Sequence, residues 1–571
     1  MLTISIEKRA ELKAWVFFLG LNFLIFLPRF LLEMSTSVLL PVGPFMEEEL
    51  YEKVKFFVTR ANYDFFRFSF DLIILLSGFL LLRKFIPIKI AAFVFGALYV
   101  HIFIYGLYFN AFEKIYQTNP LFYNDLISLK TGFFITWDSL GYLFFPALLF
   151  LGVILAALFF LAKKMFSQFA KIRISAISYV TAGALLLLSF ITLYTQGLPL
   201  KTNASVQFFL FSFTKNTAES IATHQEIKFL SPDIMQLKLT NVDEPLPVNP
   251  NIYFIFIESY GRFAYDNATV SEAHKPVLSL ETNKLKEAGY HIASGFSTSP
   301  VTGGISWLAY TSMLYGFEID KQGTYYALLR DTAWYNYPHW TRMLRDNGYT
   351  NYRLSSIATN DRMTIPWEIY SKFYAVDQWI TWEDLNYKGK VYGFGPSPPD
   401  QYALNFAQQV INSSGHEPYS LFFISQNSHN PFFSPSNVAE NWQSLSDGSI
   451  NEGQRSRFLD KPTIEDYASA VNYQVSYLSD FIRKRKNIYD IYILAGDHQP
   501  PLITSKGDNF QTPLYIISGD SALIKRLHSY GYQNELCIDV NTAGFINHSD
   551  VYHHFLSAIH YSEADIKYTG D

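Results

Sequence analysis

Two predicted strands of this chain end in side chains that bind hard metal ions. In "NIYFIFIESYGR", residues 251–262, five of the six residues from Ile252 to Ile257 are aliphatic or phenylalanine, which is typical of a strand buried on both faces. The run stops at Glu258. A second run, "DIYILAGDHQPP" from residue 490, is followed in the same way by Asp497 and His498. Because sites in open α/β sheets form at the carboxyl ends of the strands, we expect these side chains to share one site.

Two carboxylates and one imidazole are suitable ligands for a divalent cation such as Mn, Mg or Zn. Without a cation, two acids brought this close repel each other or share a proton. The "GDH" triplet alone is also compatible with an Asp-His pair that caps the next helix, so the metal site rests on both strands together.

A hydroxyl group ahead of a predicted helix adds a third element. In "SPVTGGISWLAYTSMLYGF", residues 299–317, small and hydroxyl residues precede an amphipathic stretch from Trp307 to Leu314. A hydroxyl at a helix start faces free backbone N–H groups and the positive end of the dipole, which suit a phosphate. Coordination to a metal also lowers the pKa of a hydroxyl and makes it a nucleophile. The alternative is that Ser306 is an N-cap and Thr302 a turn residue.

Composition indicates a membrane protein in two halves. The chain has 571 residues, of which 49% are hydrophobic and 18% aromatic, and its net charge is -5. A net negative charge gives no reason to expect nucleic-acid binding. The single cysteine, Cys537, excludes an intrachain disulfide and a cysteine-based zinc cluster.

Long apolar runs occur before about residue 195. Five segments are long enough to cross a bilayer: Ala14 to Leu32, Phe68 to Leu82, Ile90 to Phe109, Leu140 to Ala162 and Ile174 to Tyr194. Lys and Arg are concentrated before the first span, between the second and third, and between the fourth and fifth, so we expect a cytoplasmic N-terminus and an external C-terminal half. A soluble bundle of five helices is the alternative, but the fourth and fifth segments are apolar all round. We therefore expect a transmembrane domain at 1–197, a linker with an interfacial helix at 198–245 and an external domain at 246–571.

The external half shows the pattern of an α/β domain, in which short apolar runs alternate with amphipathic stretches. The expected parallel strands are Tyr253 to Ile257, Leu421 to Ser425, Ile491 to Ala495 and Leu514 to Ser518. The expected helices lie near 279–288, 337–347, 402–411 and 463–485.

With an acid after a strand, a hydroxyl before a helix and Asp-His after a late strand, the sequence resembles the alkaline-phosphatase and sulfatase superfamily. Its order of parts is most similar to membrane phosphoglycerol transferases of the lipoteichoic acid synthase type. That resemblance implies five membrane spans, a linker and an extracellular sulfatase-like domain with a mainly parallel sheet. It also implies one divalent metal ion, Mn first and Zn or Mg as alternatives.

The resemblance assigns roles to particular residues. "FIESYG" and "GDH" imply that Glu258, Asp497 and His498 are metal ligands, with the nucleophile as a further ligand. "SQNSHNPFF" resembles the family's His-x-Pro-Phe loop and implies that His429 contacts the substrate, whereas outside this context it reads as an ordinary loop histidine. "HSDVYHHFLSAI" resembles a late segment that packs behind the site.

The nucleophile and the head-group contacts depart from the family pattern. Sulfatase spacing back from Gly316 gives Ser306, while the longer spacing of the synthases gives Thr302. We favour Ser306. The Cys/Ser-x-Pro-x-Arg pattern of sulfatases is missing after Ser306, which argues against sulfate-ester hydrolysis. The family's Trp and Arg residues that contact the substrate have no matching motif in this sequence. Arg362 and Trp367 are the candidates for these substrate contacts.

These features predict an enzyme of a bacterial plasma membrane. It would transfer phosphoglycerol from the membrane lipid phosphatidylglycerol to an external glycan or polymer acceptor through a covalent Ser or Thr intermediate. A phosphoethanolamine transferase and a phosphoester or sulfuric ester hydrolase of the same superfamily are the enzyme alternatives, although relatives of the first kind usually carry disulfides. A catalytically inactive membrane scaffold is the non-enzyme alternative, which the intact acid and histidine set disfavours.

Overall fold

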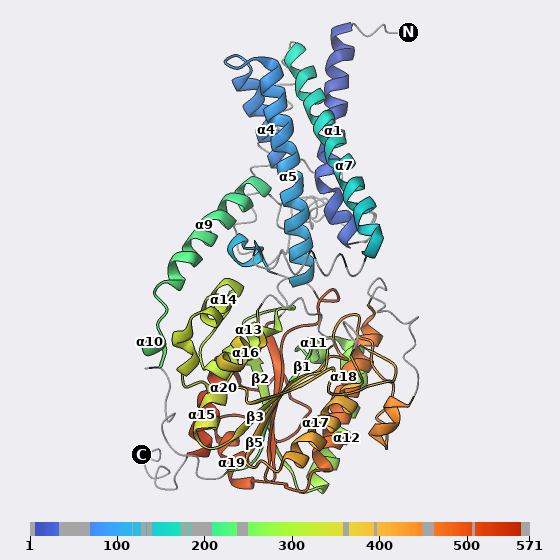
Figure 1. The fold of residues 1–571 in the computed structure, drawn as a ribbon. Helices are drawn as coiled ribbons and strands as arrows, with labels where there is room; N and C mark the ends of the chain where they lie inside the picture. Colours follow the sequence, from blue (N-terminus) through green and yellow to red (C-terminus); the bar gives the residue numbers. More distant parts are fainter. Residues whose placement is uncertain are drawn as a thin grey trace. The chain divides into compact units, whose positions relative to one another are not determined.

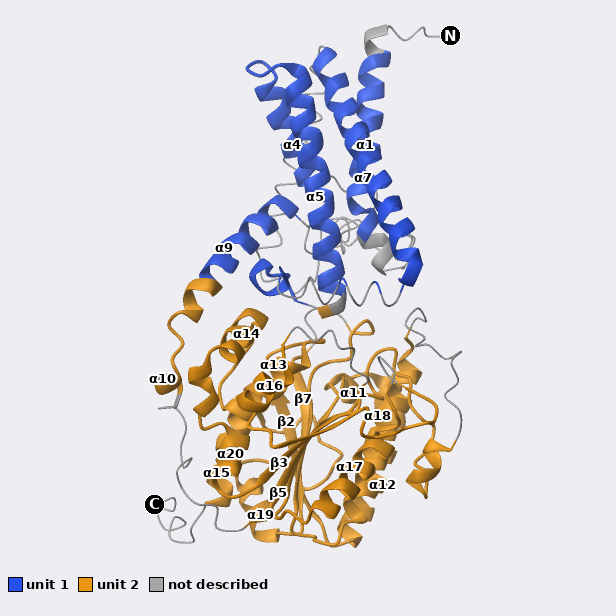
Figure 2. Ribbon diagram, viewed as in Figure 1, with its two compact units in different colours: residues 1–114, 118–222 blue, residues 115–117, 223–571 orange. Residues whose placement is uncertain are grey.

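The computed structural model describes residues 6–33, 69–116, 118–126, 140–172, 208–236, 249–357, 365–392, 397–447, 462–504 and 509–560, together with residues 133, 137, 180 and 183. The chain divides into two compact units, one formed by residues 1–114 and 118–222 and the other by residues 115–117 and 223–571 (Figure 2). The predicted boundaries at 197/198 and 245/246 lie outside the described residues, as does Arg362.

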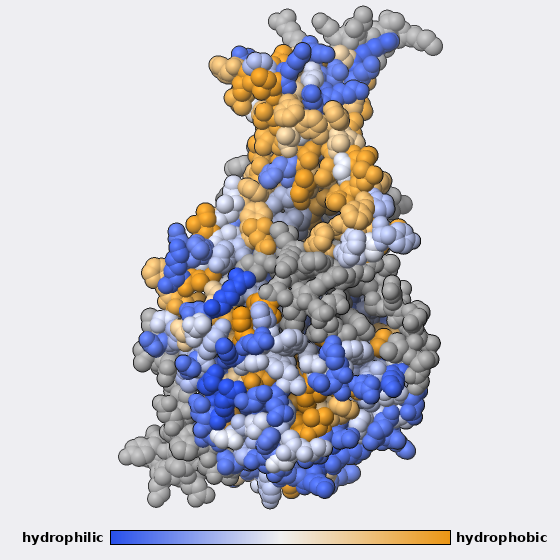
Figure 3. All heavy atoms as spheres, in the orientation of Figure 1, coloured by the Kyte–Doolittle hydropathy of each residue, from blue (hydrophilic) through white to orange (hydrophobic). Residues whose placement is uncertain are grey.

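The first unit is helical. Its main helices are α1 (Ile6–Glu33), α4 (Phe70–Leu82), α5 (Ile88–Tyr116), the short 3-10 turn η2 (Gly141–Leu143), α7 (Phe144–Lys171) and α9 (Phe209–Ile227). Within the described residues, three segments are long and apolar enough to cross a membrane: Arg9–Pro28, Ile88–Lys114 and Gly141–Lys171. Figure 3 shows hydrophobic side chains gathered along these helices.

The five predicted spans are thus found in part. The first, third and fourth correspond to the three long apolar helices, and the second corresponds to α4, which has 13 residues and is shorter than a spanning helix. Almost all of the fifth, Ile174 to Tyr194, falls outside the described residues.

Polar side chains fix the ends of helices within this unit. Ser69 caps α4 by accepting a hydrogen bond from the backbone N–H of Leu72. Asp71 in the first turn of α4 accepts hydrogen bonds from the backbone N–H groups of Phe209 and Leu210, at 3.0 and 2.8 Å. The carboxylate therefore satisfies free donors at the start of α9, which a helix cannot satisfy by itself.

The second unit is an α/β domain built on an eight-stranded sheet in the order β4-β3-β5-β1-β6-β7-β2-β8 (Figure 1). The strands are β1 (Ile252–Ile257), β2 (His291–Thr298), β3 (Thr350–Ser355), β4 (Gln378–Thr381), β5 (Tyr419–Ile424), β6 (Ile491–Gly496), β7 (Gln511–Ser518) and β8 (Phe545–Asn547). The helices are α10 (Pro232–Gln236), α11 (Phe263–Asp266), α12 (Ala268–Glu287), α13 (Ser306–Tyr315), α14 (Gln322–Arg330), η3 (Thr332–Asn336), α15 (Trp340–Asp346), α16 (Trp367–Phe373), α17 (Asp400–Ser414), η4 (Trp442–Ser446), α18 (Ile464–Arg483), α19 (Ser521–Ser529) and α20 (His548–Ile559).

Helices cover both faces of this sheet. Figure 1 shows α13, α15 and α20 on one face and α12, α17 and α18 on the other. Alternate side chains of β1 enter different hydrophobic clusters: Phe254 and Phe256 pack with the first group of helices, and Tyr253, Ile255 and Ile257 pack with the second. Burial on both faces explains why β1 reads as a continuous apolar run.

Most of the sheet is parallel, as predicted, but one of the four predicted parallel strands is not. The strand predicted at Leu514 to Ser518 is β7, which runs antiparallel to both β6 and β2. Because an antiparallel neighbour needs no crossover helix, the chain passes from β6 to β7 through a loop. Four strands were not predicted: β2, β3, β4 and β8.

Candidate active site

Three adjacent parallel strands place their carboxyl ends side by side. β1 lies between β5 and β6, with Ile257 opposite Gly496 and Phe256 opposite Ile424. Glu258 and Asp497 each follow the last residue of their strand, so the register puts the two acids next to each other. The loop that follows β5 reaches the same edge.

Glu258, Asp497 and His498 form a compact, buried cluster. One potential ligand atom from each lies within 4.8 Å of the others, which is close enough for a single metal ion. His498 Nε2 is 3.3 Å from Glu258 Oε1 and 3.3 Å from Asp497 Oδ2. The structure therefore brings together the three residues that the sequence predicts as metal ligands.

Hydrogen bonds orient these side chains so that free lone pairs point inward. Asp497 Oδ1 accepts from the backbone N–H groups of Ser259 and His498, at 2.7 and 2.8 Å, while its buried Oδ2 has no hydrogen-bond partner. His498 Nδ1–H donates to the Gln499 carbonyl at 2.8 Å, which leaves Nε2 facing the acids. A buried carboxylate oxygen without a partner is costly, and a cation at this point would satisfy it. The donor set fits a divalent ion.

The charges of the cluster strongly perturb its protonation. The pKa of Asp497 is raised. Burial is the larger cause, and the neighbouring Glu258 carboxylate is the second. Burial alone would also raise the pKa of Glu258, but the positive charges of His429 and His498 outweigh it and lower that pKa. Burial alone would lower the pKa of His498, but the negative charges of Asp497 and Glu258 outweigh this effect and raise that pKa to about 9. The cluster thus favours a positive charge held between its two carboxylates.

Ser306 lies at this cluster. It is the first residue of α13, and its Oγ donates to Glu258 Oε2 at 3.2 Å and lies 3.3 Å from His498 Nε2. The helix N-cap is Ile305, so Ser306 is not the N-cap that the alternative interpretation required. Ile305 has φ 59°, a left-handed conformation that costs a β-branched residue of order 1 kcal/mol or more. Backbone strain of this kind, here in the residue before Ser306, is frequent at functional sites.

Thr302 has different partners. Its hydroxyl donates to the backbone carbonyl of Tyr116, a residue of the same compact unit, at 3.1 Å. Its own carbonyl accepts from the backbone N–H of Gln499 at 3.0 Å. Of the two candidate nucleophiles, Ser306 is the one whose hydroxyl is bonded to the acid and histidine cluster.

His429 lies beside the cluster and is partly open to solvent. Its Nε2 is 4.0 Å from Glu258 Oε1, and its side chain is 30% exposed. The loop after β5 is tied to Glu258 by two serines: Ser425 Oγ accepts from the Glu258 backbone N–H, and Ser428 Oγ donates to the Glu258 carbonyl. These bonds hold His429 at the mouth of the site.

Trp367 begins α16 and packs edge-on against Trp379, with ring centroids 4.4 Å apart. No described contact joins Trp367 to the acid and histidine cluster. The late segment predicted to pack behind the site is α20, whose His548 Nε2–H donates to the carbonyl of Gly496, the residue before Asp497.

Asp400 is a supporting residue that the sequence reading missed. It is fully buried at the start of α17 and accepts hydrogen bonds from the backbone N–H groups of Gln426 and Asn427 and from Gln474 Nε2. It thereby fixes the loop that carries His429. The Pro399-Asp400 pair precedes an amphipathic run and so predicts a helix start. Nothing in the local sequence indicates that Asp400 also binds the loop that carries His429, because the two are separated along the chain and meet only in the folded domain.

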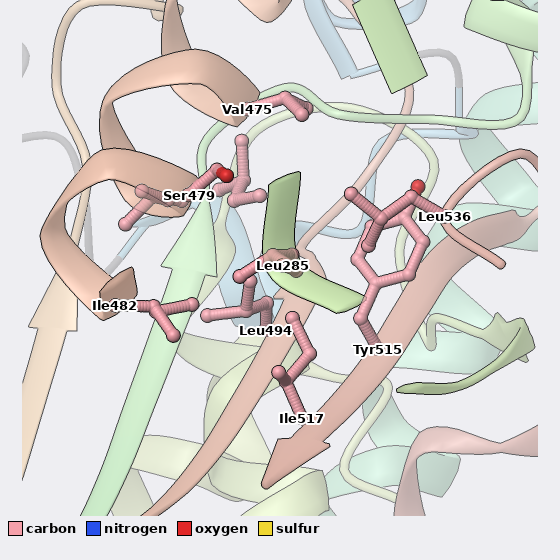
Figure 4. Close-up of a pocket in the computed structure, with 10 residues that line it drawn as sticks. Leu285, Val475, Ser479, Ile482, Leu494, Tyr515, Ile517 and Leu536 are labelled. Carbon is pink, nitrogen blue, oxygen red and sulfur yellow. The ribbon is translucent and has the colours of Figure 1, made fainter. Parts of the chain in front are cut away.

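A small cavity in the domain lies on the side of the sheet covered by α12 and α18. Apolar side chains including Leu285, Leu494 and Ile517 line it, as Figure 4 shows, and Ile257 also belongs to its lining. Its volume of about 10 Å³ is roughly the room that one water needs. With such a lining and size it is a packing defect and not a substrate site.

Comparisons with known proteins give matches in structure only. No protein-family model matches the chain, and no curated protein matches it in sequence. Among solved structures, it is similar to the lipoteichoic acid synthase LtaP from Listeria monocytogenes, with 14% identity, 57% of this chain and 77% of that chain covered, and a TM-score of 0.36.

It is also similar to the phosphoglycerol transferase GacH from Streptococcus pyogenes, with 14% identity, coverage of 59% and 80%, and a TM-score of 0.34. A third match is the C-terminal periplasmic domain of EcEptC from Escherichia coli, with 14% identity, coverage of 54% and 84%, and a TM-score of 0.32. These are the kinds of protein that the sequence motifs resemble.

Proposed function

We propose that this protein is a membrane-anchored, metal-dependent phosphotransferase that moves a phosphoglycerol group from phosphatidylglycerol to a glycan or polymer acceptor. Ser306 is the nucleophile and forms a covalent ester. Glu258, Asp497 and His498 hold one divalent ion, with Mn as our first candidate and Zn or Mg as alternatives.

The observation that carries this proposal is the position of the Ser306 hydroxyl. It lies at 3.2 Å from Glu258 and 3.3 Å from His498, inside a buried set of three ligand-type side chains at the edge of a parallel sheet. A serine that only capped a helix would need neither neighbour. A binding scaffold would have no reason to keep a buried Asp497 oxygen that lacks a hydrogen-bond partner beside a second acid and an imidazole.

The residues of this chain account for both halves of a transfer. Ser306 Oγ attacks phosphorus, the bond between phosphorus and the diacylglycerol oxygen breaks, and the serine proton ends on that oxygen, releasing diacylglycerol. His429, at the mouth of the site, is the group placed to donate the proton or to hold the head group. An acceptor hydroxyl then attacks the ester, and Ser306 regains a proton.

A cation bound by Glu258, Asp497 and His498 would lower the pKa of the serine hydroxyl and stabilise negative charge on the phosphoryl oxygens. Asp497 Oδ2 and His498 Nε2, which face each other inside the cluster, are the atoms of this chain that suit it.

The membrane helices fit a lipid donor. An enzyme anchored in the bilayer meets its lipid substrate at a high effective concentration, so binding becomes effectively intramolecular. We place the protein in a bacterial plasma membrane, with five spans, a cytoplasmic N-terminus and the α/β domain outside.

Release of diacylglycerol tests this proposal. The full chain in phosphatidylglycerol vesicles with Mn should release diacylglycerol, and Ser306→Ala should slow release about a thousandfold or more, as loss of a nucleophile does. Thr302→Ala, whose hydroxyl has a structural partner, should change the rate much less. Release from phosphatidylethanolamine but not from phosphatidylglycerol would replace the donor, and release from neither would overturn the proposal.

A further inference from the structure

Arg353 has an unusual environment for a charged side chain. It lies on β3, and only 8% of the residue is exposed. Its guanidinium carbon lies 4.2 Å from the ring centre of Phe422, 4.5 Å from that of Tyr374, 5.0 Å from that of Tyr310 and 5.4 Å from that of Trp379. Four aromatic rings thus surround the cation.

Arg353 also lacks an acidic partner. Within the described part of the chain, its side chain makes no hydrogen bond or ion pair. Other arginines of the domain are paired: Arg262, which also lies over an aromatic ring, contacts Asp266 at 3.1 Å, and Arg345 contacts Asp377 at 2.7 Å.

The rings attract the charge of Arg353 but cannot bind its donors. A cation is attracted to the face of an aromatic ring, but a ring offers no acceptor for the five N–H groups of a guanidinium. An oxyanion would satisfy both the charge and the donors, and guanidinium groups bind phosphate with two parallel hydrogen bonds.

The elements around Arg353 are those that carry the candidate active site. Tyr310 lies one helical turn after Ser306 on α13, so the two share a face of that helix. Phe422 lies on β5, which leads to the His429 loop, and Tyr310 also packs against Phe256, two residues before Glu258.

The geometry points to Arg353 as a binding residue for a phosphate oxyanion of the substrate, in a subsite walled by Tyr310, Tyr374 and Trp379. That the oxyanion is a phosphate rests on the proposed function. The phosphate belongs either to the lipid donor or to an anionic acceptor.

Phosphate binding tests the subsite without requiring activity. Inorganic phosphate is titrated into the EDTA-treated full chain by calorimetry, and Arg353→Met should weaken binding about 10- to 100-fold, the value of a charge-assisted hydrogen bond or two. Arg353→Lys keeps the charge but loses the two parallel hydrogen bonds, so its phosphate affinity should lie between those of the wild type and Arg353→Met. It replaces Arg353→Met in the test where the Met variant does not fold. Arg345→Met removes a paired surface arginine and should bind like the wild type. Equal binding by the wild type and both Arg353 variants would overturn the inference.

Kinetics then identify the source of the phosphate. If the bound phosphate belongs to the lipid donor, Arg353→Lys raises the KM for diacylglycerol release. If it belongs to the acceptor, the rate of diacylglycerol release with water as the acceptor is unchanged in Arg353→Lys, and transfer to added glycerol phosphate falls. A lowered melting temperature with unchanged phosphate binding and unchanged kinetics would make Arg353 structural. Phosphate binding through Arg353 in a wild type that releases no diacylglycerol would sink the proposed function and leave the subsite standing.

Discussion

At the scale of single residues, Asp497 divides its two carboxylate oxygens between two tasks. Oδ1 accepts two backbone hydrogen bonds that fix the side chain, and Oδ2 is buried without a hydrogen-bond partner, 3.3 Å from His498 Nε2. The sequence predicts this cluster because each acid follows an apolar run that is typical of a buried strand. Asp400 and Arg353 were missed, because their significance lies in what tertiary packing places around them.

Removing the charge of Asp497 should strongly weaken metal binding while leaving the fold intact. Asn at this position keeps an oxygen for the two backbone donors but loses the anionic ligand. Loss of an outer-shell partner alone costs about 10- to 100-fold in metal affinity, so Asp497→Asn should cost about 100-fold or more. Mn content after equilibrium dialysis of the full chain measures this.

The matched control is Asp490→Asn, which neutralises a buried acid at the other end of the same strand, bonded to Asn251 and Asn487. It should lower stability without changing Mn content. Equal Mn content in wild type and Asp497→Asn would contradict the ligand assignment.

His274 should make the fold sensitive to mild acid. It is fully buried, contacts Tyr260 through Nε2 and donates to Asn472 through Nδ1, and burial lowers its pKa to about 4 from 6.5. Between pH 6.5 and 4 the unfolded chain binds a proton that the folded chain does not, so stability falls as the pH falls. The full loss is about 3 kcal/mol.

Denaturant unfolding of the full chain in detergent from pH 7.5 to 4 tests this, with His274→Gln as the comparison because glutamine does not titrate. The variant should lose less stability over this interval than the wild type. Parallel stability curves for the two proteins would show that another group causes the acid sensitivity.

At the scale of elements, strong apolar runs were predictable and polar or small ones were not. β1 and β6 are apolar throughout and were found. β2, "HIASGFST", is buried although small and hydroxyl residues make up most of it, and β3, "TNYRLS", holds the buried Asn351 and Arg353. The antiparallel direction of β7 depends on how its connection from β6 runs, which composition does not reveal.

The close approach of two strand ends requires a glycine in the "GDH" triplet. A Cβ at Gly496 would lie 1.8 Å from the backbone oxygen of Tyr260, so any side chain would push β1 and β6 apart where they present Glu258 and Asp497. Gly496→Ala should destabilise the domain by about 3 kcal/mol and reduce Mn binding.

Gly295→Ala is the control within the same sheet, because a Cβ there would meet its nearest atom at an ordinary 3.5 Å. Thermal unfolding and Mn content of both variants decide the matter. If Gly496→Ala behaved like Gly295→Ala, the spacing of the strand ends would not be critical to the site.

At the scale of the whole molecule, the chain joins apolar helices to an α/β domain with a buried acid and histidine set. The contrast between the two halves was visible in composition, and three of the five predicted spans are long apolar helices in the described residues. Orientation and the exact linker rest on the sequence, because loop charges and domain boundaries fall largely outside the described residues. A lipid-directed transferase accounts for why both halves are in one chain.

The most direct measurement is the intact mass of the full chain, quenched in acid after brief incubation with phosphatidylglycerol vesicles and Mn. The proposed mechanism predicts an adduct of one phosphoglycerol on the wild type and on Thr302→Ala, and none on Ser306→Ala. An adduct that persists in Ser306→Ala, or none on the wild type while diacylglycerol is being released, would contradict the covalent serine mechanism.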